Sequence, residues 1–212
     1  MQKGILLLDT GVILPFCSIR FPTSKKKVID FMIEKFEIFI PDDIEVEMQK
    51  PKAMLIDKWE EISLTWTYIR SKVKKMNPPE DCVNTILKEC KIKNKAKAPA
   101  ELKVLALGLY LSRFYKSPVF LSTHEKDAFK WFAFVSRKQQ LGYVLSPYDI
   151  LTFVHVYLNL PYNDVNYAWG ELCQFPGISS TLLLIPISYA SSLDVCYQYC
   201  NTKSCVHQHV IV

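Results

Sequence analysis

The sequence predicts an α/β fold in which a parallel sheet of about four to five strands lies between two helical layers, a doubly wound three-layer α/β/α arrangement. The short all-apolar run at residues 5–8 is typical of a parallel strand buried on both faces. Similar short runs occur at 37–40, 119–121 and 143–145, and helical patterns lie between them. Strands that alternate with helices favour parallel pairing through helical crossovers.

Two helical patterns illustrate this alternation. Residues 28–36 carry the first, and Leu102, Leu105, Ala106 and Leu109 repeat at the i, i+3, i+4, i+7 spacing of one helix face. We therefore expect the second helix to bury that face and to lead into the strand that follows it.

Residues 51–97 interrupt the alternation. A long helical pattern covers residues 54–76, the breaker Asn77-Pro78-Pro79 follows, and a second helical pattern covers 81–90. We interpret this stretch as a helical arm inserted into one domain that spans residues 1–160.

The end of the chain is less regular. A further helix is predicted at 148–157, but beyond Pro161 the pattern loses its period, so residues 161–212 are described as a C-terminal extension of undefined structure. The extension contains soft ligands that could hold zinc, although their spacing matches no closed structural site. We favour incidental thiols and imidazoles for these residues, which are Cys196, Cys200, Cys205, His207 and His209.

Composition sets broad limits on function. Half of the 212 residues are hydrophobic and 22% are charged, which is typical of one folded domain with its own core. Lys plus Arg exceed Asp plus Glu by 26 to 21, a surplus that favours a polyanionic partner without proving one. No stretch has the length and apolarity of a membrane span, and no secretion signal is evident, so we expect a cytoplasmic protein with reduced cysteines.

Acidic residues follow successive predicted strands. Asp9 comes directly after the first strand, Glu47 lies in the segment after the second, and Glu125 and Asp127 follow the third. Glu101 opens the helix that leads to the third strand. Because ligand sites in open parallel sheets lie beyond the carboxyl ends of the strands, we expect these acids to cluster.

Such a cluster predicts a divalent cation. Carboxylates brought together raise each other's pKa, and a cation removes this cost. Hard oxygen ligands favour Mg²⁺ or Mn²⁺ over zinc, and two such ions about 3.5–4 Å apart can promote phosphodiester hydrolysis.

Several of the acids also have simpler explanations. Asp9 could cap the helix that follows it, and Asp42 and Glu45 have the spacing of a capping box, which is the role we assign to that pair. Glu47 could lie on a solvated helix face. With Pro99 at the first helical position, Glu101 could compensate a helix dipole. These explanations do not predict that the acids share one edge of the sheet.

Five segments follow one another in the order ILLLDTGVIL, IFIPDDIEVEM, PAELKVLALGLYL, VFLSTHEKDAF and GYVLSPYDIL. No single motif is specific, but their order is, and together they cover about residues 4–152 without the arm. In this order they resemble the PIN-domain family, nucleases that include the toxins of many prokaryotic toxin–antitoxin pairs and several RNA-processing enzymes.

The resemblance implies that Asp9, Glu47 and Glu101 bind Mg²⁺ or Mn²⁺. Members of the family usually place an Asp one or two residues after the Thr that corresponds to Thr123, whereas this chain has His124 and Glu125. Glu125 is the nearest chemical equivalent and is expected to be the fourth catalytic acid. Asp127 is expected to compensate as a further acidic metal ligand. Thr10 and Thr123 are expected to orient ligands or water through their hydroxyls. His124 is expected either to be solvated or to contact the metal or a phosphate.

Basic and aromatic residues suggest how a polynucleotide is held. A lysine-rich segment leads to Glu101 and is interpreted either as a solvated linker or as a phosphate-guiding arm. Trp131, Phe132 and Phe134 could stack on bases, but at helical spacing we favour core positions. The lysines proposed to bind nucleic acid are Lys91, Lys93, Lys95 and Lys97.

Taken together, these features predict a metal-dependent endoribonuclease that cuts RNA, with single-stranded DNA as a second candidate polynucleotide. The alternative is a PIN-like module that has lost its ion and binds nucleic acid or protein. A nucleotide-binding domain is disfavoured because no Gly-rich loop follows the first strand. The resemblance also implies a homodimer or an antitoxin-like protein as candidate partners.

Overall fold

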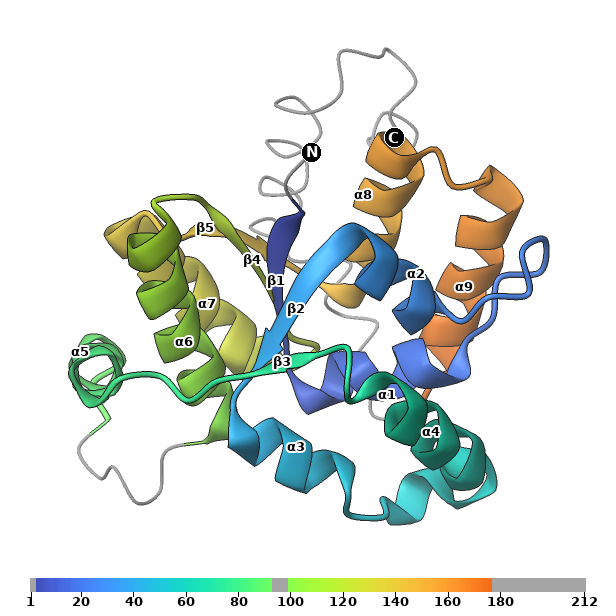
Figure 1. Cartoon of the computed structure of the whole chain (residues 1–212), viewed down its shortest axis with the longest axis horizontal. Helices are drawn as coiled ribbons and strands as arrows, with labels where there is room; N and C mark the ends of the chain where they lie inside the picture. Colours follow the sequence, from blue (N-terminus) through green and yellow to red (C-terminus); the bar gives the residue numbers. More distant parts are fainter. Residues whose placement is uncertain (1–2, 93–98, 177–212) are drawn as a thin grey trace.

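The computed structural model describes residues 3–92 and 99–176, and it has the predicted fold class (Figure 1). A single five-stranded sheet has the order β3-β2-β1-β4-β5, and every pair of neighbours is parallel. The strands are β1 (Gly4–Leu8), β2 (Phe36–Ile40), β3 (Lys74–Lys75), β4 (Val119–Ser122) and β5 (Gly142–Leu145).

Helices cover both faces of this sheet. Figure 1 shows α5, α6 and α7 on one side and α1, α2, α8 and α9 on the other, with α4 outside α1. The helices before β3 are α1 (Thr10–Ser18), α2 (Val28–Lys35), α3 (Asp42–Met48), the short 3₁₀ helix η1 (Ala53–Leu55) and α4 (Ile56–Ile69). The later ones are α5 (Glu80–Glu89), α6 (Ala100–Tyr115), α7 (Lys126–Gln139), α8 (Pro147–Leu158) and α9 (Tyr162–Gln174).

The central strand is buried, as expected for a strand covered on both faces. Residues 5–8 are almost fully inaccessible, and Leu7 pairs with Phe39 of β2 and with Leu121 of β4. The predicted face of α6, from Leu102 to Leu109, is also buried. The four strands predicted from apolar runs are confirmed to within one residue at each end.

The order in which the chain adds strands to the sheet reverses beside β1. From β1 the chain continues outward through β2 to β3, and it then returns to place β4 and β5 on the other side. A crevice opens where the connections on either side of the central strand diverge, beyond the carboxyl ends of the strands. This crevice lies between β1 and β4.

The prediction of one long helix at 54–76 is wrong. The helix α4 ends at Ile69, and Lys74–Lys75 instead form β3, which pairs with Phe39–Ile40 at the edge of the sheet. Ile62, Trp66 and Ile69 bury one face of α4, and the chain then turns to reach the sheet. Lysines suit an edge strand because their charge discourages pairing with another chain. The inserted segment therefore extends the sheet.

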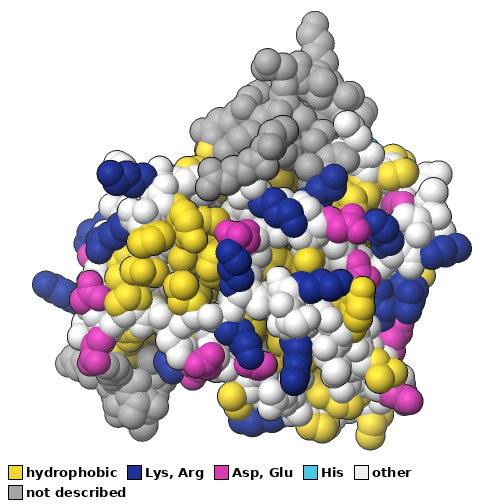
Figure 2. All heavy atoms as spheres, viewed as in Figure 1, with side chains coloured by type: hydrophobic (Ala, Val, Ile, Leu, Met, Phe, Trp, Pro, Cys, Tyr) yellow, Lys and Arg dark blue, Asp and Glu magenta, His cyan; other side chains and the backbone are white. Residues whose placement is uncertain are grey.

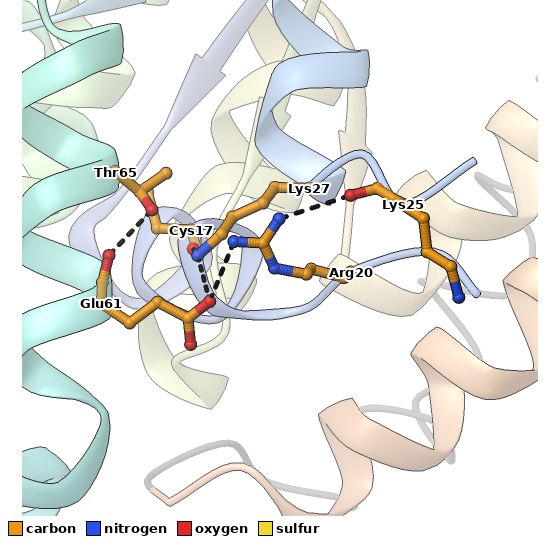
Figure 3. A network of polar contacts seen from close by, with 6 residues as sticks. All are labelled: Cys17, Arg20, Lys25, Lys27, Glu61 and Thr65. Carbon is orange, nitrogen blue, oxygen red and sulfur yellow. Dashed lines mark hydrogen bonds and ion pairs between the residues drawn. The ribbon is translucent and has the colours of Figure 1, made fainter. Parts of the chain in front are cut away.

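An ion pair between the buried Lys27 and the half-exposed Glu61 fixes α4 to the body of the protein (Figure 3). The side chain of Lys27 is only 4% exposed, and its Nζ donates to the backbone oxygen of Cys17 at 2.6 Å and to Oε1 of Glu61 at 2.7 Å. Arg20 lies 3.4 Å from the same carboxylate. Partial burial would raise the pKa of Glu61, but Lys27 and Arg20 outweigh it and lower that pKa. This charge is locally neutralised.

Residues 162–174 form a helix, α9, that their sequence pattern did not indicate. The helix α9 packs on α8, with the rings of Tyr148 and Trp169 in an edge-on contact at 5.5 Å. Asp164 is buried and accepts a hydrogen bond from the backbone N–H of Thr23 at 2.8 Å. These contacts join the first part of the C-terminal extension to the core.

None of the helices in the described ranges has the length and apolar character needed to cross a membrane.

Candidate functional site

Asp9 is buried at the carboxyl end of β1, where it both caps a helix and keeps an unused oxygen. It is 2% exposed, and its Oδ1 accepts a hydrogen bond from the backbone N–H of Val12 at 2.9 Å, which confirms the capping role. Its Oδ2 is buried without a hydrogen-bond partner among the described residues. An unpaired buried carboxylate oxygen is costly, so helix capping accounts for Oδ1 of Asp9 but not for Oδ2.

The backbone brings the segment after β4 beside Asp9. The N–H of Asp9 donates to the carbonyl of Ser122 at 3.2 Å, which continues the register in which Leu8 pairs with Ser122. The next residues, Thr123 and His124, therefore lie next to Asp9 at the crevice.

Three of the predicted acids line one pocket at this edge. The pocket has a volume of about 290 Å³. Glu47 comes from α3, Glu101 from the first turn of α6, and Glu125 from the N-cap of α7. The other lining residues described are Thr10, Gly11, Leu14, Lys52, Met54, Leu55, His124, Phe175 and Pro176. We call this the acid pocket.

The four acids share one electrostatic field. Burial is the main cause that raises the pKa of Glu101 to about 7, and hydrogen bonding to its own backbone partly offsets it. The negative charges of Glu125, Asp9 and Glu47 raise it further, in that order. The carboxylates of Asp9, Glu47, Glu101 and Glu125 therefore lie within electrostatic range of one another.

Both predicted threonine hydroxyls hold neighbouring groups in place. The Oγ1 of Thr10 donates to Oε2 of Glu47 at 2.6 Å and so links α1 to α3. The Oγ1 of Thr123 accepts from the backbone N–H of Glu125 at 3.1 Å. Each threonine thus orients a segment that carries an acid, and the solvated-face explanation for Glu47 does not hold.

His124 is part of the site and is not a solvated loop residue. Its side chain is 18% exposed, and its Nδ1 lies 3.8 Å from Oδ2 of Asp9, too far for a hydrogen bond but close enough for electrostatic attraction. Burial of the ring disfavours its charged form, but Asp9 first, and then Glu125 and Glu101, outweigh burial and raise the pKa of His124.

Gly11 makes room for this imidazole. A Cβ built at Gly11 would lie 1.7 Å from Nδ1 of His124, so no larger residue fits without moving the ring. This role of Gly11 was not predicted, although a small residue directly after Asp9-Thr10 is a signal that could have indicated it.

Other predicted residues lie elsewhere. The Asp127 side chain is 78% exposed and pairs with Lys130 at 2.9 Å, so the structure does not bring it to the acid pocket. Lys91 follows the C-cap of α5 with a left-handed backbone, and Lys93, Lys95 and Lys97 lie outside the described residues, as do the cysteines and histidines of the tail. Of the aromatic residues, Phe132 is in the core as favoured and Trp131 is partly buried against it. The core position favoured for Phe134 is wrong, because its side chain lies on the outer face of α7 and is 54% exposed.

Two helix starts differ from their predictions. The capping box of Asp42 and Glu45 is wrong, because α3 begins at Asp42 with Pro41 as its N-cap. Asp42 instead accepts a hydrogen bond from Asn77, just after the edge strand β3, and Glu45 pairs with Lys75 within that strand. Pro99 is the N-cap of α6 and not its first residue, which still leaves Glu101 in the first turn.

The donor set suits a hard divalent cation. Oxygen donors come from Asp9, Glu47, Glu101 and Glu125, and the unpaired Oδ2 of Asp9 and the raised pKa of Glu101 are both relieved by positive charge. In residues 3–92 and 99–176, no three His, Cys, Asp or Glu side chains already converge closely enough to enclose an ion. The acids would therefore have to move closer together around it.

Comparison of the sequence with protein-family models and with curated proteins finds no match. The interpretation of the site consequently depends on its own chemistry and geometry.

Proposed function

We propose that this protein is a metal-dependent endoribonuclease of the PIN type that hydrolyses RNA phosphodiester bonds at the acid pocket. The observation that carries the proposal is the convergence of Glu47, Glu101 and Glu125 on one pocket beside the unpaired Oδ2 of Asp9. These residues come from four separate segments of the chain. Helix capping and dipole compensation do not account for their meeting at the switch point of the sheet.

Asp9, Glu47, Glu101 and Glu125 would hold Mg²⁺ or Mn²⁺. Such ions activate a water and offset the charge on the leaving oxygen in phosphodiester hydrolysis. The remaining groups have supporting roles: Thr10 fixes Glu47, Thr123 fixes the backbone at Glu125, and the helix cap fixes Asp9. His124 lines the same pocket beside Asp9, where its ring would contact the metal or a phosphate oxygen.

One observation favours a second candidate, a PIN-like module that binds nucleic acid or protein without cutting. The described acids are close enough to influence each other's charge but not close enough to enclose an ion. Glu125 also replaces the shorter acid expected at that place. In this alternative the pocket would bind a partner without supporting hydrolysis.

The setting that we propose follows from the same resemblance. The enzyme would act in the cytoplasm, where buried free thiols such as those of Cys17 and Cys82 remain reduced. RNA is the proposed substrate, single-stranded DNA a second one, and a homodimer or an antitoxin-like protein the proposed protein partner.

A cleavage assay tests the proposal. Purified protein is incubated with a labelled single-stranded RNA and Mn²⁺, Mg²⁺ or EDTA, and Asp9→Asn is compared with Asp127→Asn. Asp127 is the matched control because it is an exposed acid outside the pocket. We expect cleavage to need the metal, to be lost in Asp9→Asn, and to be kept in Asp127→Asn.

Two results would count against the nuclease. Equal cleavage by wild type and Asp9→Asn would place the reaction elsewhere. Wild-type protein that binds RNA but leaves it intact with either ion would favour the binding module.

A further inference from the structure

A second and larger pocket adjoins the acid pocket. It has a volume of about 420 Å³ and lies where the chain enters α4. Lys52 lines both pockets and so stands on the boundary between them. The lining residues are Pro51, Lys52, Ala53, Ile56, Trp59, Glu60, Ser63 and Leu64. We call this the arm pocket.

The walls of the arm pocket are apolar and exposed. Ile56 is 76% exposed and Leu64 is 66% exposed, while Trp59 is partly buried and supplies an aromatic ring. Figure 2 shows hydrophobic side chains among charged ones at the lower right, over the region where Figure 1 places α4. Several large apolar side chains gathered around one hollow mark a binding surface.

Positive charge lies at the boundary of the two pockets. Lys50 and Lys52 form no ion pair with another residue of the described ranges, and Lys50 is exposed. The Nζ of Lys58 lies 5.5 Å from the ring centre of Phe175, which lines the acid pocket. Of these three lysines, Lys52 lines both pockets and is the one placed to contact an anion between the acids and the apolar walls.

We propose that the arm pocket binds an unpaired nucleobase of the RNA, while Lys52 contacts a phosphate of the same strand beside the acid pocket. This inference rests on the proposed function and adds a base-binding subsite to it. A single nucleotide unit joins a flat apolar base to an anionic phosphate, which matches an apolar pocket with a lysine at its edge. Glu60 and Ser63 supply polar atoms for the edges of the base.

The helix behind the pocket is rigid enough to present it preformed. Ile62, Trp66 and Ile69 hold α4 against the core, and the ion pair between Lys27 and Glu61 anchors the same helix. The helix that carries Trp59 is therefore held in place, and stacking of a nucleobase on the Trp59 ring costs little reorganisation. A base within a duplex is already stacked and paired, so we expect the pocket to select single strands.

Binding of labelled RNA by the full chain in EDTA tests this subsite without any cleavage. The probe is a single-stranded oligomer of about ten nucleotides, within the usual range of site sizes, compared with its duplex. We expect Trp59→Ala to weaken single-strand binding roughly 5- to 150-fold, because stacking contributes about that much, and Trp59→Phe to retain most of it. The control is Tyr68→Ala, an exposed aromatic of the same helix that does not line the arm pocket.

Two further changes keep the test decisive if Trp59→Ala unfolds the protein. Ile56→Asp places a negative charge at a 76% exposed position and should weaken binding by at least about fivefold. Lys52→Gln should lower the dependence of log K on log salt by about one phosphate contact, whereas Lys116→Gln, at the far end of α6 from Glu101, should not.

An RNA that carries an abasic residue identifies the base in the pocket. Removal of the base at one position of the RNA should weaken binding to the wild-type protein but not to Trp59→Ala. Equal binding by wild type, Trp59→Ala and Ile56→Asp, or equal binding of duplex and single strand, would overturn the subsite. Metal-dependent cleavage that persists alongside such a result would leave the nuclease standing. Trp59-dependent binding without any cleavage would reject the nuclease and keep the subsite.

Discussion

Two clusters of charged groups, around Lys27 and around Asp9, differ in how their charge is balanced. Lys27 is 4% exposed but has two close oxygen partners, and Arg20 adds a second cation to Glu61. Asp9 is 2% exposed, shares its surroundings with three other acids, and leaves one oxygen unpaired. The first cluster is complete within the chain, whereas the second needs a positive charge from outside.

The difference separates a structural role from a functional one. Groups that hold a fold together are satisfied by the fold, and groups that serve a ligand carry a cost until the ligand arrives. Substituting a glutamate by glutamine should therefore have opposite effects in the two clusters.

Removing the acid of the balanced cluster should have the largest effect on stability. Glu61→Gln removes the negative charge that balances the buried ammonium of Lys27 and leaves it with neutral oxygens only. Because Glu61 itself is 46% exposed, we expect a loss of about 2–3 kcal/mol in the free energy of unfolding. Urea denaturation followed by circular dichroism measures it. Glu34→Gln, whose partner Lys26 is 48% exposed, is the control and should cost less than about 1 kcal/mol. Equal losses for the two variants would show that burial of Lys27 does not determine the loss in the free energy of unfolding.

Adding a cation to the unbalanced cluster should have an intermediate effect. Mg²⁺ or Mn²⁺ at 10 to 100 times its dissociation constant should stabilise the wild type by about 1–3 kcal/mol at pH 8, because it binds only the folded chain. Thermal unfolding with increasing metal, reversed by EDTA, measures this gain. Asp9→Asn should lose most of it and Asp127→Asn none. A gain of the same size in both variants would point to binding away from the acid pocket.

Neutralising one acid of the unbalanced cluster should have the smallest effect, and it should be stabilising. The pKa of Glu101 is raised from 4.5 to about 7, so without metal the folded state is penalised as pH rises through this range. Glu101→Gln should therefore stabilise the metal-free protein at pH 8 by about 1 kcal/mol, after allowance for partial solvent exposure, and hardly at all near pH 4.5. Denaturation at both pH values measures the difference. Destabilisation at pH 8 would contradict the proposed repulsion.

The acid cluster could be predicted from the sequence because it depends on the geometry of parallel sheets. Once runs such as residues 5–8 and 119–121 are placed as neighbouring strands, Asp9 and the segment at Thr123 must meet at one edge. Short sequence patterns predict the order of strands and helices, and that order predicts most of the fold.

What could not be predicted depends on packing between distant segments. No local pattern indicates that Lys52 and Phe175 line one pocket, or that Lys74–Lys75 join the sheet. The choice between Glu125 and Asp127 likewise depends on which way each side chain leaves the start of α7. Residues 162–174 lack a clear apolar period, yet they form α9, which packs on α8.

The pairing of β1 with β4 also determines when the site can exist. Leu7 meets Leu121 only after on the order of a hundred further residues have been made, and such long-range contacts form late in folding. A chain still on the ribosome can build β1 and β2 early, but it has no imidazole beside Asp9 and no Glu125 across the crevice. Under the proposed function, a site able to cut RNA would therefore exist only once the second half of the sheet has docked.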